Sequence, residues 1–195
     1  MAIVFELVVN FGSNDAAACA AYELVVSHRP LVVGGRDVGL HEPLLHRTRG
    51  GNLLTQQPVD EASAYLEMSV VPIGVGWGVA IDRGHEVVRL RAAELAEVGH
   101  QLYQLLAGFT GYQAAQVGWD IEGFVDPAEL RQEWAEELEG GELRGLVLAD
   151  DFLSELRGPS FLPFVPGFVW VPYEGEAPST LTSDGPEIRP LRRLR

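Results

Sequence analysis

The sequence predicts an α+β protein: a ferredoxin-like βαββαβ antiparallel sheet with helices on one face, an insertion after the first helix and a C-terminal α/β extension. Two observations predict it. Segments with a period of two in their apolar residues recur through residues 1–120, and two segments with helical periodicity separate them. Each predicted helix has one apolar stripe that must be covered, so we expect both helices to pack on one side of the sheet.

The first strand is predicted over residues 3–11, which alternate between two sets of side chains, one of them wholly apolar. The run Gly12-Ser13-Asn14-Asp15 ends this strand and supplies a turn and a helix N-cap. A helix is predicted over residues 14–28, and Pro30 lies just beyond its end. This is the first β–α unit of the fold.

The middle of the predicted fold is a hairpin preceded by an insertion. Residues 29–64 are rich in Gly, Pro, His and Arg and predict an irregular insertion with a short strand at 31–33. Residues 65–71 and 75–81 predict two strands joined around Pro72-Ile73-Gly74. The second strand places bulky residues, Trp77 among them, on one core face and small residues on the other.

The second helix and the last strand complete the predicted core. Apolar residues at spacings of three and four predict a helix from about residue 91 to residue 109, ended by Gly111. Residues 112–119 predict the next strand. Residues 1–120 therefore form the predicted ferredoxin-like domain, with the insertion at 29–64.

Residues 121–195 are predicted to be an acidic helical and extended subdomain with a basic tail. Asp126-Pro127 is a strong helix start, and Gly140-Gly141 ends that helix. A short strand at 143–148, a short helix at 150–157 and an extended segment at 161–173 follow. The tail closes in a run that contains four arginines and no acid, residues 189–195.

The composition excludes several kinds of chemistry. All 14 basic residues are arginine, so a phosphate loop that ends in lysine and a Schiff-base lysine are impossible. The single cysteine, Cys19, excludes an intrachain disulfide and a site of paired thiolates, and its alanine-rich surroundings predict a buried side chain.

The charge indicates the kind of partner. A formal net charge of −14 argues against nucleic acid, because phosphate binding depends on excess positive charge. No stretch approaches the length of an apolar membrane span, and the N-terminal segment does not resemble a targeting signal. We therefore expect a soluble cytoplasmic protein that binds no nucleic acid and spans no membrane.

Acidic residues concentrate between residues 121 and 156, which contain eleven acids and two arginines. On the helix after Asp126 we expect one exposed acidic face, with an apolar stripe on another side. A solvated face that serves only solubility would look the same in the sequence. The candidate partner-binding residues on this face are Glu129, Glu133, Glu136 and Glu137.

The predicted function is that of a non-enzymatic interaction protein, which binds a basic patch on a protein partner through this acidic helix. It would be a regulatory, assembly or immunity-type factor, and it would need no cofactor. Acidic complementarity would steer the association and make it specific.

Two alternatives from other classes stay open. One is a small hydrolase that uses Asp82, His85 and Asp120, since a carboxylate, an imidazole and a second acid are suited to acid–base chemistry. The other is a small-molecule-binding module on the bare face of the 65–81 hairpin. His41 and His46 are the first candidate metal ligands to test, but their spacing does not match the helical zinc motif, so we expect no metal.

Overall fold

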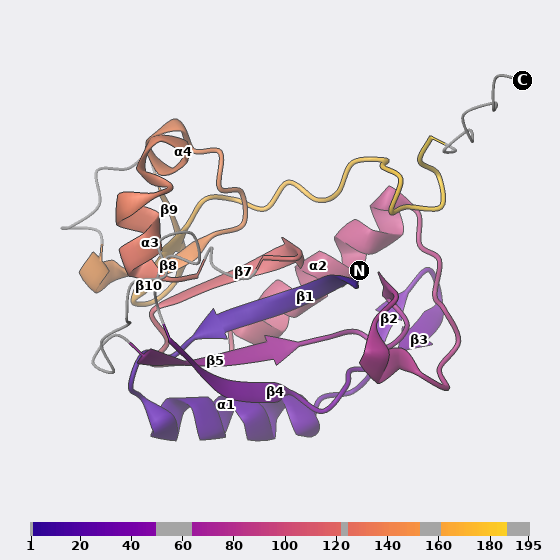
Figure 1. Cartoon of the computed structure of the whole chain (residues 1–195), viewed down its shortest axis with the longest axis horizontal. Coiled ribbons are helices and arrows are strands. Elements are labelled where there is room, and N and C mark those ends of the chain that lie inside the picture. The colour runs from indigo at the N-terminus through magenta and orange to yellow at the C-terminus, as the bar shows by residue number, and fades with distance from the viewer. Residues whose placement is uncertain (1, 50–63, 122–124, 153–160, 187–195) are drawn as a thin grey trace, which may run out of the picture.

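The computed structural model describes residues 2–49, 64–121, 125–152 and 161–186, and these form an eight-stranded antiparallel sheet with two main helices (Figure 1). The strand order is β4-β5-β1-β7-β8-β10-β9, and β6 pairs with the start of β1. The strands are β1 (Ile3–Asn10), β4 (Leu44–Arg49), β5 (Ala64–Val70), β6 (Gly76–Trp77), β7 (Ala114–Trp119), β8 (Val147–Ala149), β9 (Leu162–Val165) and β10 (Phe168–Trp170). A separate hairpin consists of β2 (Leu31–Val33) and β3 (Arg36–Val38).

Strand β1 lies at the centre of the first part of the sheet. Leu7 is opposite Val70 of β5 and Val117 of β7, both in antiparallel register. Residues 5–10 are buried on both faces of the sheet. Such burial is uncommon for an antiparallel strand and requires cover on both sides.

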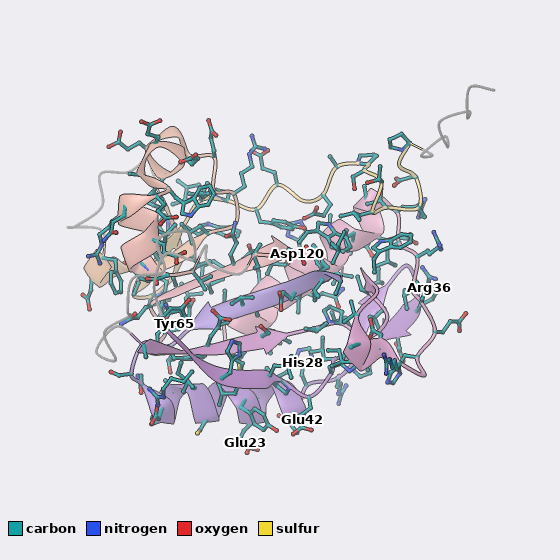
Figure 2. The ribbon with its side chains drawn as sticks, in the orientation of Figure 1. Glu23, His28, Arg36, Glu42, Tyr65 and Asp120 are labelled. Atoms are coloured by element: carbon teal, nitrogen blue, oxygen red, sulfur yellow. The ribbon has the colours of Figure 1, made fainter. Side chains whose placement is uncertain are left out.

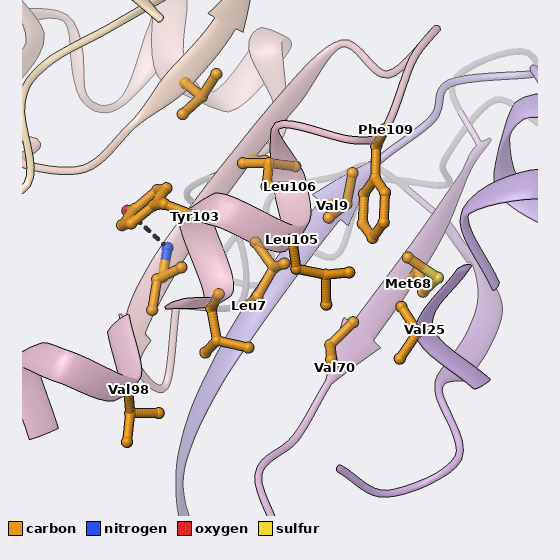
Figure 3. Close-up of a cluster of buried hydrophobic side chains, with 14 of the residues drawn as sticks. Leu7, Val9, Val25, Met68, Val70, Val98, Tyr103, Leu105, Leu106 and Phe109 are labelled. Atoms are coloured by element: carbon orange, nitrogen blue, oxygen red, sulfur yellow. Dashed lines mark hydrogen bonds between the residues drawn. The ribbon is translucent and has the colours of Figure 1, made fainter. Parts of the chain in front are cut away.

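The two main helices, α1 (Asp15–Val26) and α2 (Ala92–Leu106), contribute to one core against one face of the sheet. Figure 3 shows Leu7 and Val9 of β1 in the same cluster as Val25 of α1 and Leu105 of α2. Helix α1 begins where predicted, because the Asn14 side chain accepts a hydrogen bond from the amide of Ala17.

The opposite face is covered by two short helices, α3 (Pro127–Gln132) and α4 (Ala135–Gly140). Val8 on this face of β1 belongs to a second core with Leu130 of α3 and Leu138 of α4. The predicted acidic helix is therefore two helices. The carbonyl of Glu129 accepts hydrogen bonds from the amides of both Glu133 and Trp134, which opens the helical turn before α4 begins.

Residues 171–186, which we name the strap, follow β10 and lie along α2 (Figure 1). The ring of Tyr173 packs against Tyr103 of α2, with a distance of 5.2 Å between ring centroids. At the other end the Asp184 carboxylate accepts a hydrogen bond of 3.0 Å from the amide of Ala92, the first residue of α2. The amide of Ser183 also donates to the carbonyl of Leu90.

The predicted hairpin of residues 65–71 and 75–81 is wrong. Strand β5 pairs with β4, which lies within the predicted insertion at 29–64. Of residues 75–81 only Gly76 and Trp77 form a strand, β6, and it pairs with β1 and not with β5. Gly78 has a φ of 65°, and Ala80–Asp82 form a 3-10 turn, so the second strand cannot continue. Trp77 is 37% exposed and is covered in part by Arg89, not buried in the core.

Two smaller expectations also differ from the structure. Cys19 is exposed on α1, whereas its neighbours at positions 18 and 21 are the alanines that pack into the core. In the C-terminal region the described part of the predicted 150–157 helix is a 3-10 turn, Asp150–Phe152, and the remainder lies outside the described residues.

Candidate functional site

A groove of about 470 Å³ lies beside the C-terminal half of α1, between this helix and residues 39–42. Figure 2 shows Glu23, His28 and Glu42 near that end of the helix. We name it the α1 groove, and its described lining consists of Tyr22, Val25, Val26, His28, Pro30, Gly39, Leu40, His41 and Glu42. Its volume is in the range of small-molecule sites.

His41, which lines the α1 groove, forms a pair with Asp82. The Nε2 atom of His41 lies 2.6 Å from Oδ1 of Asp82, and both side chains are largely buried, with 13% and 14% of their surface exposed. The same Asp82 oxygen accepts a hydrogen bond of 2.9 Å from the amide of Gly74. Two donors to one carboxylate oxygen fix the position of that oxygen, and therefore also the orientation of the imidazole.

The loop between β6 and α2 brings Asp82 to His41 by folding back onto Gly74, which precedes β6. The amide of Val88 donates to the carbonyl of Gly74, and a Cβ atom at position 74 would overlap the carbonyl oxygen of Glu86. Gly74 also has a φ of 75°, a conformation that favours glycine. On the other side, the amide of His41 donates to the carbonyl of Val71, which holds the imidazole beside the end of β5.

Tyr22 and Glu42 form the second polar contact of the α1 groove. The Tyr22 hydroxyl donates to the Glu42 carboxylate, and this hydrogen bond raises the pKa of Tyr22 above its ordinary value. The charges of Glu42 and Glu23 act in the same direction. A third polar contact positions the His28 ring: its Nδ1 atom lies 2.6 Å from the carbonyl oxygen of Arg29.

The three residues of the hydrolase alternative do not form one site. His85 lies near the pair, with its ring centroid 5.4 Å from that of His41. Asp120 instead accepts a hydrogen bond of 2.8 Å from the amide of Val4, on the β7 side of β1, whereas Asp82 and Gly74 lie on the β6 side. The residue that pairs with Asp82 is His41, which was considered from the sequence only as a candidate metal ligand.

The four predicted partner-binding acids lie on α3, on α4 and between them. Glu133 and Glu136 are exposed, and Glu129 and Glu137 are half-buried. The apolar residues of the same segment, Leu130 and Leu138, are buried, so the acids point away from the second core. We name Glu129, Glu133, Glu136 and Glu137 the acidic surface.

The acids of this region are close enough to influence one another. Partial burial raises the pKa of Glu129, and the charges of Asp126 and Glu133 raise it further. Like charges that raise a carboxyl pKa indicate a local negative potential, which an approaching positive group would relieve. One described arginine in this region, Arg144, is already paired with Glu174 of the strap.

Polar side chains are also buried between the sheet and its cover, and the sequence analysis missed them. Asn10, Glu67 and Gln116 are each less than a tenth exposed and lie on neighbouring strands. Both polar atoms of the Asn10 side chain are hydrogen-bonded, because Nδ2 donates to the carbonyl of Val125 and Oδ1 accepts from the amide of Gly12. Each of the three residues alternates with the apolar residues that precede and follow it in its strand, and this was the signal that could have revealed a second, partly polar buried face.

The two candidate metal ligands lie in different places. His41 pairs with Asp82, and His46 on β4 lies 3.3 Å from the buried carboxylate of Glu67. Within residues 2–49, 64–121, 125–152 and 161–186, no group of three or more His, Cys, Asp or Glu side chains is arranged to hold a metal ion. The described helices include none long and apolar enough to cross a membrane.

The chain matches no protein-family model, and no curated protein or solved structure is significantly similar to it.

Proposed function

We propose that this protein is a non-enzymatic interaction protein and that its acidic surface binds a basic patch on a protein partner. Regulatory, assembly and immunity-type factors all belong to this class. Charge complementarity at such a surface raises the association rate and excludes partners of the wrong sign.

The observation that supports this proposal best is the arrangement of α3 and α4. Their apolar residues are used in the second core, while Glu133 and Glu136 are exposed. The pKa of Glu129 is raised by partial burial and, further, by the charges of Asp126 and Glu133. Like-charge pairs on a helix cost about 0.2 to 0.5 kcal/mol each. Concentrated acids therefore reduce the stability of this region, and a positively charged partner would offset that cost.

The test compares two variants with the same change in net charge. In the first, each residue of the acidic surface is replaced by glutamine. In the matched control, four acids on other elements are replaced by their amides, namely Glu23, Asp37, Glu86 and Glu97. Both tagged variants and the wild type are used for affinity capture from the native cell, followed by quantitative mass spectrometry at low and high salt.

We expect a protein with a basic surface patch to be enriched by the wild type and the control and lost from the acidic-surface variant. The enrichment should weaken with salt, because exposed charges are screened over about 8 Å at physiological ionic strength. Equal retention by the two variants would contradict the proposal. Equal loss would indicate that net charge alone causes the capture, which also contradicts it.

The hydrolase alternative has less support. Asp120 is held on the other side of β1 from Asp82, as described above. The described contacts of His41 include no hydrogen bond to a serine, threonine or cysteine that would act as a nucleophile. The hairpin alternative loses its basis, because residues 75–81 do not form the predicted strand.

We also infer a ferredoxin-like arrangement for the segment β1-α1-β4-β5-α2-β7. The order β7-β1-β5-β4 supports it, with the first and third strands of the unit adjacent at its centre. Helices α1 and α2 contribute to one core against one face. An NMR structure that lacks the contact between β1 and β5 would refute the assignment.

A further inference from the structure

We propose that the α1 groove is a binding site for a small organic cation: a protonated amine attached to a short apolar body. This site is independent of the acidic surface, and its residues lie on α1 and in segment 28–42. Three properties of the groove support the proposal: the protonation pattern of its histidines, its charge and its apolar walls.

Two histidines line the groove, and the described contact of each ring occupies one of its two nitrogens. Nε2 of His41 lies against a carboxylate oxygen that also receives the Gly74 amide, so Nε2 carries the proton. Nδ1 of His28 lies against a carbonyl oxygen, so the proton of that ring is on Nδ1. In a neutral imidazole the other nitrogen is then an acceptor: Nδ1 of His41 and Nε2 of His28.

The charges near the groove favour a cation. Glu42 lines it, and Glu23 is close enough for its charge to raise the pKa of Tyr22. The groove lies at the C-terminal end of a 12-residue helix whose last turn contains no basic residue, and a helix C-terminus carries partial negative charge. No arginine belongs to the described lining, although Arg29 contributes its backbone carbonyl to the position of His28.

The remaining walls set the chemistry of the ligand. Val26, Pro30 and Leu40 are apolar and at least partly exposed, and Val26 is 55% exposed, so an apolar body would remove their surface from water. A metal ion fits less well, because the described side chains do not converge into a group of three metal ligands. An anion also fits less well, because the Glu42 carboxylate and the lone pairs of the two imidazoles would repel it. A protonated amine supplies donors to all three acceptors.

The experiment uses three probes of similar shape and different charge: isopentylamine, isopentanol and isocaproate. Binding to the full chain is followed by NMR through the methyl groups of Val25, Val26 and Leu40. The buffer is set at about pH 8, where an ordinary imidazole is neutral and an alkylamine is protonated. We expect saturable shifts with the amine and affinities at least about tenfold lower for the alcohol and the carboxylate, as for a charged donor in a partly desolvated site.

Three variants locate the site and separate it from an effect of net charge. Glu42→Gln and His41→Phe should each weaken amine binding by about three- to fivefold, the range of a partly exposed charged contact. Glu139→Gln, on α4, removes the same charge as Glu42→Gln and should leave the affinity unchanged. Melting temperatures of all variants establish that each is folded before its affinity is compared.

Four results would overturn the proposal: no saturable shift with the amine, equal binding of the alcohol, unchanged affinity in Glu42→Gln, or an equal loss in Glu139→Gln. None of these results bears on partner capture by the acidic surface, so the proposed function and this inference fail separately.

Discussion

Replacing either of two buried tyrosines, Tyr103 or Tyr112, with phenylalanine removes a hydroxyl group. We expect the two substitutions to change the free energy of unfolding in opposite directions. The Tyr103 hydroxyl accepts a hydrogen bond of 3.0 Å from the amide of Val117 and donates one of 2.8 Å to the carbonyl of Gly145 (Figure 3 shows the first). The Tyr112 hydroxyl is also buried, yet it has no hydrogen-bond partner among the described residues. Burial raises the pKa of both phenols, so both are neutral at physiological pH.

The expected change in the free energy of unfolding depends on which hydrogen-bonding groups lose their partner when the hydroxyl is removed. Tyr103→Phe leaves two buried backbone groups without a partner, and each costs about 1 to 3 kcal/mol when unpaired, so we expect a loss of about 2 to 6 kcal/mol. Tyr112→Phe removes a buried hydroxyl that already lacks a partner, and we expect a gain of about 0 to 2 kcal/mol. The stacking of residue 112 on Phe168, with centroids 4.0 Å apart, is retained by the phenylalanine ring.

Urea denaturation followed by circular dichroism measures both free energies of unfolding. For a chain of this size 1 kcal/mol corresponds to about 2 to 4 °C, so Tyr103→Phe should melt at least about 4 °C below the wild type. A loss in Tyr112→Phe as large as that in Tyr103→Phe would refute the reasoning. It would mean that the hydrogen-bonding assignment of one hydroxyl is wrong.

Three further changes test other contacts. Glu129→Gln should stabilise the protein more at pH 7 than at pH 4, as measured by urea titrations. The pKa of Glu129 is raised in the folded state, so the stability of the wild type falls as the pH rises from the ordinary glutamate pKa through the folded-state pKa. Gly99→Ala should cost about 1 to 3 kcal/mol, because the new Cβ atom would lie 2.5 Å from the Tyr173 hydroxyl, and a double-mutant cycle with Tyr173→Ala should recover most of the loss. Asp184→Ala should lower the melting temperature in a thermal scan and increase hydrogen exchange at Ala92, since it removes the acceptor for that amide; unchanged exchange would contradict the role of the strap.

The elements with a strong period were predicted from sequence. The helix expected over 91–109 is α2, Ala92–Leu106, because its apolar stripe is wide and regular and its tertiary packing agrees with it. The strand expected over 3–11 is β1, Ile3–Asn10. In both cases local propensity and the needs of the core favour the same structure.

The errors occur where the local pattern and the tertiary contacts disagree. Residues 75–81 alternate like a strand, but the glycines permit a positive φ, and the chain turns back to bring Asp82 to His41. Strand β4 was missed because its sequence, Leu-Leu-His-Arg-Thr-Arg, does not alternate between apolar and polar residues. It lies at the edge of the sheet, where only one neighbouring described strand defines it.

The candidate sites differ in how far sequence can define them. The acids of α3 and α4 are local, and their exposure follows from the apolar residues between them. The pair of His41 and Asp82 joins residues 41 positions apart, in two loops whose paths depend on Gly74 and on the carbonyl of Val71. No spacing rule predicts that contact, because it depends on the positions of loops after folding.

The charge of the C-terminal arginines gives the last prediction. A chain that ends after Pro186 loses residues 187–195 and their four arginines but keeps the described anchors of the strap, the contacts of Ser183 and Asp184. Exposed ion pairs contribute only about 0 to 1 kcal/mol each and are screened by salt. If the C-terminal arginines do not neutralise the acidic surface, truncation should change the melting temperature by no more than about 2 °C at low and at high salt. A large loss at low salt that disappears at high salt would show that the chain neutralises its own acids, and the proposed function would lose its main support.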